Sequence, residues 1–174
     1  LRNDGSSRFA KDNRWGLFPS VALAWKMKEE TFLKDVSVLS DMKLRLGWGK
    51  TGQQEIIGDE YYYPSTASYQ TSGDFGYYPA GVNPDGTINW IKLMRPNAYN
   101  PSLKWETTIT WNAGIDYGFL NNRINGAIDV YFRKTQDLIN KEAPAIAGIS
   151  PAERMVRNIG TLENNGIEFS INAR

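Results

Sequence analysis

Side chains of opposite character alternate without a break from Trp105 to Phe119. The odd positions are apolar, aromatic or Thr, and the even positions are polar or Gly. Because successive side chains of an extended strand point to opposite faces, this segment predicts one long strand with an apolar and a polar face. Strands of soluble proteins typically have about 5 to 6 residues, whereas a strand tilted across a bilayer has about 9 to 11. The length of this segment therefore favours a strand that spans a membrane.

The same alternation recurs along the rest of the chain. We expect strands at about residues 1–8, 15–27, 41–50, 104–119, 123–137 and 158–174. The polar turn at 120–123 joins two of them in a hairpin, while the connection at about 51–103 is long and rich in Gly, Pro, Tyr and Asn. Short turns on one side and long loops on the other are typical of transmembrane β-barrels. The predicted fold is all-β, an antiparallel transmembrane β-barrel, with the long loop outside the cell.

The apolar faces of these strands carry the residues that we expect to touch lipid. At about 3.3 Å per residue and a tilt near 40°, Trp105 and Tyr117 are separated by roughly 30 Å along the membrane normal. That spacing is typical of the two aromatic girdles of a membrane barrel. The predicted lipid-facing residues are Trp48, Trp105, Ile109, Trp111, Ile115, Tyr117, Phe132 and Phe169.

Composition excludes several classes of function for this stretch of chain. The chain is 41% hydrophobic with a mean hydropathy of −0.49, and it lacks an apolar run long enough for a transmembrane helix. Its net charge of +1 gives no general attraction to nucleic acid. Cys and His are absent, which excludes a Ser-His-Asp triad, a Cys-His pair and a His-ligated zinc. We therefore expect no catalytic residues, no cofactor and no metal site in this stretch, and we expect that it is not an enzyme.

Two local motifs have simpler explanations than catalysis or nucleotide binding. Residues 49–51, Gly-Lys-Thr, resemble the end of a phosphate-binding loop, but Leu44 occupies the position of the required Gly. Glu29, Glu30 and Asp35 offer carboxylates, but nothing in the sequence fixes them at the separation that glycoside hydrolysis needs. A solvated turn is the better interpretation of that acidic segment.

Aromatic residues crowd the long loop and allow two interpretations. Their rings can stack on sugar rings or peptide side chains, or they can pack the loop on itself and against a partner. The candidate residues for contact with a substrate or partner are Tyr61, Tyr62, Tyr63, Tyr77, Tyr78 and Trp90.

Charged residues on the polar faces, such as Asp116 and Asp129, also have two interpretations. They contact a solute in the barrel interior, or they form the charge pairs that hold the wall. We favour charge pairs, since a charge that is cut off from water needs a partner.

Several longer runs resemble one family of membrane proteins, the SusC/RagA-type TonB-dependent outer-membrane transporters. The similarity spans nearly the whole chain, and the loop at 53–100 is its most variable part. The runs that carry it are RNDGSSRF at 2–9, WGLFPSVALAW at 15–25, KLRLGWGKTG at 43–52, LKWETT at 103–108 and NIGTLENNGIEF at 158–169.

This resemblance implies a twenty-two-stranded barrel with an N-terminal plug domain in the Gram-negative cell outer membrane. It also implies TonB-dependent import of a bulky solute, an oligosaccharide (glycan) or a peptide. The implied partners are a SusD-like surface lipoprotein and the TonB complex, which engages an N-terminal region. About six strands cannot close so wide a cylinder, so we interpret the chain as a fragment from the C-terminal part of the barrel, with the plug domain absent.

The alternating pattern also fits one other fold. In a soluble secreted β-sandwich, for example a carbohydrate-binding module, strands alternate in the same way and the apolar faces pack on each other. Strand length favours the membrane protein, because sandwich strands are typically shorter.

Overall fold

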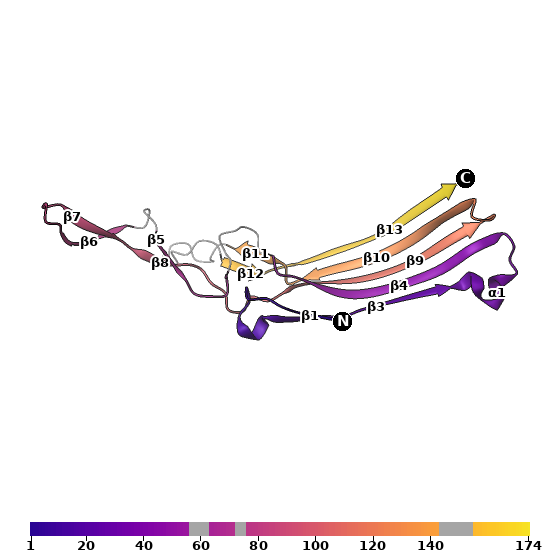
Figure 1. Cartoon of the computed structure of the whole chain (residues 1–174), viewed down its shortest axis with the longest axis horizontal. Coiled ribbons are helices and arrows are strands. Elements are labelled where there is room, and N and C mark those ends of the chain that lie inside the picture. Colours follow the sequence, from indigo (N-terminus) through magenta and orange to yellow (C-terminus); the bar gives the residue numbers. More distant parts are fainter. Residues whose placement is uncertain (56–62, 72–75, 143–154) are drawn as a thin grey trace.

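The computed structural model describes residues 1–55, 63–71, 76–142 and 155–174. One long antiparallel sheet, the central sheet, forms most of the molecule (Figure 1). Its strand order is β13-β10-β9-β4-β3. These strands are β3 (Ser20–Lys26), β4 (Leu39–Gln53), β9 (Glu106–Phe119), β10 (Ile124–Gln136) and β13 (Thr161–Ala173).

The register of the central sheet separates apolar from charged side chains. Ile115 of β9 pairs with Leu44 of β4 and with Ile128 of β10, so one face carries a continuous row of aliphatic residues. One position away, Gly114 pairs with Arg45 and with Asp129, so the opposite face carries charges. We call these the apolar face and the polar face. The alternation in the sequence thus becomes a two-faced sheet, as predicted.

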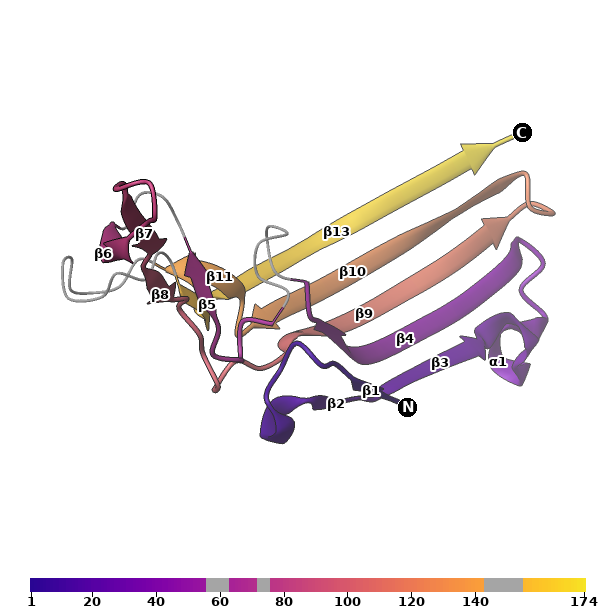
Figure 2. The same cartoon turned by 60° about the vertical axis from the view of Figure 1, so that its left-hand side comes forward.

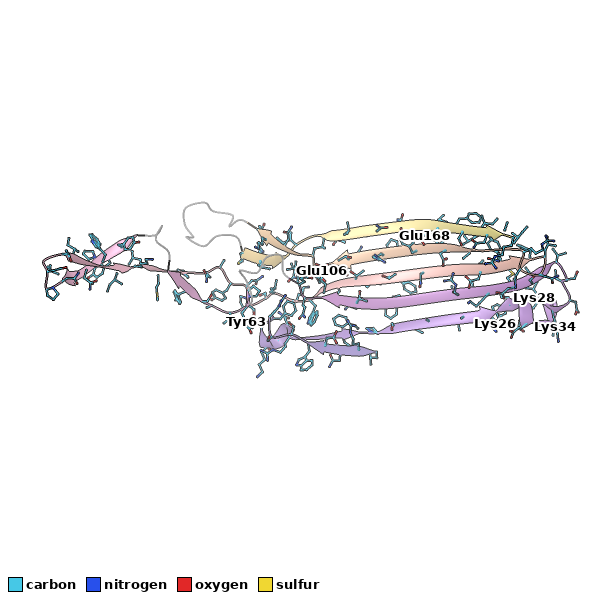
Figure 3. The ribbon with its side chains drawn as sticks, turned by 45° about the horizontal axis from the view of Figure 1, so that its top comes forward. Lys26, Lys28, Lys34, Tyr63, Glu106 and Glu168 are labelled. Carbon is cyan, nitrogen blue, oxygen red and sulfur yellow. The ribbon has the colours of Figure 1, made fainter. Side chains whose placement is uncertain are left out.

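Tight connections close one end of the central sheet, which we call the turn end. Leu120, Asn121 and Asn122 adopt positive φ values of 53°, 55° and 61° and turn β9 into β10. Between β3 and β4 lie a 3-10 turn, η2 (Met27–Glu29), and one helical turn, α1 (Thr31–Lys34). Figure 3 shows Lys26, Lys28 and Lys34 gathered there. Within the described residues, no helix has the length and apolar character needed to cross a membrane.

A small hydrophobic core lies at the opposite end, the loop end. There β1 (Arg2–Gly5) pairs with β2 (Trp15–Phe18) around a 3-10 turn, η1 (Lys11–Asn13), and β11 (Ile139–Glu142) pairs with β12 (Met155–Asn158). We call this core the rim cluster; it consists of Phe9, Phe18, Leu103, Trp105, Ile139 and Val156.

The strand expected at residues 15–27 is divided into β2 and β3 at Pro19. Pro has no backbone N–H to give to a ladder, which explains the break. Its carbonyl still accepts a hydrogen bond from the backbone N–H of Lys50, at 2.9 Å.

The long connection contains strands that the sequence did not lead us to expect. β5 (Tyr69–Thr71) pairs with β8 (Met94–Pro96), and β6 (Tyr77–Val82) pairs with β7 (Ile88–Lys92). The β6–β7 hairpin extends beyond the loop end of the central sheet (Figures 1 and 2). The long loop predicted at about 51–103 therefore contains two pairs of short strands within its described residues.

Candidate functional site

Four charged side chains form an ion network across three strands of the polar face. The Arg45 guanidinium lies 2.8 Å from the Asp116 carboxylate and 2.9 Å from the Asp129 carboxylate. The Lys43 ammonium lies 3.0 Å from Asp116. These side chains are only about one quarter to one third exposed, at 34% for Lys43, 36% for Arg45, 26% for Asp116 and 32% for Asp129. Such partly desolvated pairs fix the positions of their members more strongly than surface pairs do.

Gly114 makes room for this network. It is buried between Arg45 and Asp129, and a Cβ at this position would overlap with the Asp129 carboxylate and the Arg45 guanidinium. A Gly inside a strand usually weakens it, so its presence here has a packing reason. The absence of a side chain on β9 allows charges on β4 and β10 to meet across the middle strand.

Polar contacts at the loop end attach β11 and β12 to the central sheet. Glu106, which Figure 3 places at this end, accepts a hydrogen bond from the backbone N–H of Ile139 at 3.0 Å. The Asn158 side-chain amide donates to the carbonyls of Lys104 and Asp137, both at 2.8 Å, and its oxygen accepts from the Lys104 N–H at 2.9 Å. The loop end is therefore a structured rim.

The apolar face carries a row of aromatic rings near the loop end. Trp48 and Trp111 are register partners, and their ring centroids lie 5.9 Å apart. Phe132 extends the row on β10, where it pairs with Trp111. Trp111 is 57% exposed, although it lies in the middle strand of five. Such exposure of large rings along a sheet face marks a surface that contacts something apolar.

The predicted lipid-facing residues separate into two groups. On the apolar face lie Trp48, Ile109, Trp111, Ile115, Tyr117, Phe132 and Phe169. Trp105 differs, because it is only 8% exposed within the rim cluster, with ring centroids 5.2 Å from Phe9 and 5.3 Å from Phe18. Its indole N–H donates to the Arg14 carbonyl at 3.1 Å. Protein covers Trp105, so the prediction that it touches lipid is wrong.

The structure does not bring the loop aromatics to one place. Trp90 pairs with Pro79, and it lines with Tyr77 a hollow of about 300 Å³ on the hairpin. Tyr78 is one position from Tyr77 and therefore lies on the opposite face. Tyr63 lies back at the loop end of the central sheet (Figure 3). Each of these four residues is 47–60% exposed. Tyr61 and Tyr62 lie outside the described residues.

Lys43 and Arg45 are the site residues that the sequence did not single out. Both occupy polar positions of an alternating strand, which was visible in the sequence. Their importance depends on the pairing of β4 with β9, two strands that are distant in the chain. Among the described residues, no group of three or more carboxylate, His or Cys side chains is placed to hold a metal ion.

Comparison with known proteins identifies this sheet as part of a larger barrel. A family model described as "TonB dependent receptor-like, beta-barrel" matches residues 1–174. The chain is 56% identical over 174 residues to the TonB-dependent receptor SusC of Bacteroides thetaiotaomicron. The aligned region covers 100% of this chain and 16% of that relative. It is 38% identical to the TonB-dependent receptor P3 of Formosa agariphila, over 99% of this chain and 16% of that relative.

Solved structures show the same similarity. The "RagAB peptide importer in the 'closed-closed' state" superposes on 97% of this chain with a TM-score of 0.73 and 29% sequence identity. The match covers 17% of that chain. The predicted fold class, part of an antiparallel transmembrane barrel, is confirmed. The chain belongs to the family of TonB-dependent receptor β-barrels.

Proposed function

We propose that the parent protein imports a bulky solute across the cell outer membrane in a TonB-dependent way, and that this chain supplies part of the barrel wall and an outer loop. The observation that carries the proposal is the family match over residues 1–174 together with a sheet that has one charged and one apolar face. Because this chain spans 16% of its SusC relative, the activity belongs to the whole protein.

The two faces suggest how the wall is oriented. In transmembrane barrels the apolar face contacts lipid and the polar face lines the interior. With Trp105 covered by protein, the outer aromatic girdle is the row of Trp48, Trp111 and Phe132, and Tyr117 and Phe119 form the inner one. Trp111 and Phe119 then lie roughly 20 Å apart along the normal at a tilt near 40°, close to the height of an apolar band.

The ion network is then part of the inner wall. Its charges are already paired with each other, which supports a structural role and leaves solute binding to other residues. The soluble β-sandwich alternative is not supported, because it requires a second sheet over the apolar face. In the part of the chain that the structure describes, no second sheet covers that face.

We propose an oligosaccharide or a peptide as the solute, the two classes that the sequence resemblance implies. One solved relative is described as a peptide importer, which supports the peptide class. We propose that Tyr77 and Trp90 form a stacking surface for solute or for a SusD-like surface lipoprotein. Both rings are about half exposed on one face of the projecting hairpin.

Uptake by cells that produce the full-length parent tests this function. Labelled oligosaccharides and labelled peptides are offered to cells with and without a working TonB complex. We expect TonB-dependent accumulation of one class. Accumulation that is equal with and without TonB, or none for either class, would refute the proposed import.

A variant pair tests the role of the hairpin. Trp90→Ala removes a ring from the proposed stacking face, and Tyr78→Ala removes one from the opposite face of the same hairpin. We expect Trp90→Ala to reduce uptake or lipoprotein binding by roughly tenfold, as stacked rings contribute 0.5–1.5 kcal/mol beyond their burial. Tyr78→Ala is the matched control with a smaller effect. Unchanged uptake and unchanged lipoprotein binding in both variants would refute the proposal that the hairpin contacts solute or the lipoprotein.

A further inference from the structure

A groove on the apolar face has a floor of small and aliphatic residues and a wall of aromatic rings. We call it the wall groove; its volume is about 400 Å³. Ala113 lies between Leu46 and Val130 in the register, and its short side chain leaves the hollow. Trp48 and Trp111 border the hollow on the side of the loop end. Nearly all of its lining is apolar, so a hydrocarbon chain fits it chemically.

Two lysines stand beside the groove on the same face, further toward the loop end. Lys50 and Lys134 both pair with Ile109, one from each side. Each is two residues beyond the aromatic row, or about 7 Å along its strand. They are two strand spacings apart, about 9.5 Å, so their flexible side chains can converge over Ile109.

The two ammonium groups differ in what they already bind. Lys134 lies 2.7 Å from the Glu163 carboxylate on β13. Lys50 forms no ion pair or side-chain hydrogen bond with the rest of the described chain. A charge on the outer surface of a barrel is costly at the membrane midplane and is tolerated near the interface. The two lysines therefore mark the headgroup level of the outer leaflet, directly outside an aromatic girdle.

We propose that the wall groove and the two lysines together bind one outer-leaflet lipid that carries both an acyl chain and a phosphate. The acyl chain lies in the groove against Ala113, and the phosphate lies between the ammonium groups of Lys50 and Lys134. Glu163 opposes this binding, because its carboxylate competes for Lys134. The inference rests on the proposed function, since it requires the apolar face to lie in lipid.

Native mass spectrometry of the full-length parent in neutral detergent tests the phosphate part. Dioleoyl phosphatidic acid is titrated, with dioleoylglycerol as the phosphate-free lipid. Lys50→Gln and Lys134→Gln should each weaken binding of phosphatidic acid roughly fivefold, the effect expected of one basic residue at a membrane surface. Glu163→Gln should strengthen it. Lys26→Gln, at the turn end, is the control and should leave it unchanged.

A second variant pair tests the groove itself. Ala113→Leu fills the floor of the groove and should weaken binding, whereas Ile128→Leu, elsewhere on the apolar face, should not. Both changes exchange aliphatic residues at exposed positions, so folding should be retained.

Three results would overturn the proposal. They are unchanged binding in both lysine variants, equal binding of dioleoylglycerol, and displacement of the lipid by millimolar inorganic phosphate, which would indicate a site for free phosphate. Failure of the proposed function would appear differently, as a wild-type parent that does not import. A parent that imports normally and retains the same lipid in every variant refutes this inference alone.

Discussion

Replacing Arg45 by Met should destabilise the barrel wall by about 2 kcal/mol. Arg45 pairs with both Asp116 and Asp129, and the three side chains are 36%, 26% and 32% exposed. An exposed pair contributes up to about 1 kcal/mol, and removal of one partner from a fully buried pair costs about 3–5 kcal/mol. Exposure near one third places this network between those limits. Asp116 keeps its contact with Lys43, so most of the loss falls on Asp129.

The assay is urea unfolding of the full-length parent refolded into phospholipid vesicles. A double-mutant cycle of Arg45→Met and Asp129→Asn isolates the coupling between the two residues, which we expect to be about 1 kcal/mol or more. Lys26→Gln is the control, because the Lys26–Glu29 pair is 65% and 70% exposed and should contribute less than about 0.5 kcal/mol. Additive effects, with a coupling within about 0.5 kcal/mol of zero, would refute the structural role of the ion network.

Three further predictions concern single positions. Gly114→Ala should lower the free energy of unfolding by more than about 1 kcal/mol in the same assay, because its Cβ would enter the ion network. Gly49→Ala is the control and should be tolerated, because its Cβ would meet only one ordinary contact, at 3.4 Å. Trp105→Ala should lower the free energy of unfolding by about 3–5 kcal/mol, because the ring is buried. Trp111→Ala, on the exposed face, should lower it by less. The reverse order would contradict the burial of Trp105 in the rim cluster. Hydrogen bonds from Thr87 to the Asp85 carboxylate lower the pKa of Asp85 in the folded hairpin below its ordinary value of 3.8. The ionised carboxylate therefore stabilises the turn at pH values above 3.8. This stabilisation is lost as the pH falls through the pKa of the folded state. A lower protection factor of the amide at position 87 (its exchange rate corrected for the intrinsic rate) below about pH 4 checks this sign. A protection factor that is independent of pH would contradict it.

The apolar and polar faces of the long strands could be predicted from the sequence, because the face of each side chain depends only on its position within its own strand. Alternation assigns each side chain to a face before the neighbouring strand is known. The pairing of charges could not be predicted in this way. Asp116 and Arg45 are 71 positions apart, and only the register of β4 against β9 brings them together.

Trp105 and the projecting hairpin show where local pattern failed. Trp105 continues the alternation of β9, but Phe9 and Phe18 come from the other end of the chain and cover it. The hairpin does have a local signal in the sequence, Asn-Pro-Asp-Gly at 83–86, which is typical of a turn. There Gly86 adopts a φ of +85°, and the flanking segments pair as β6 and β7.

A spin label at Ile115 tests the central claim, that the apolar face lies in lipid. Ile115 is in the middle strand of the central sheet and is 36% exposed on that face. The label is attached to a Cys introduced into the full-length parent, which is then reconstituted in phospholipid bilayers. We predict frequent collisions of the label with oxygen, which concentrates in hydrocarbon, and few with a water-soluble nickel complex. High accessibility to nickel, or low accessibility to both reagents, would place the label in water or against protein and would contradict the account.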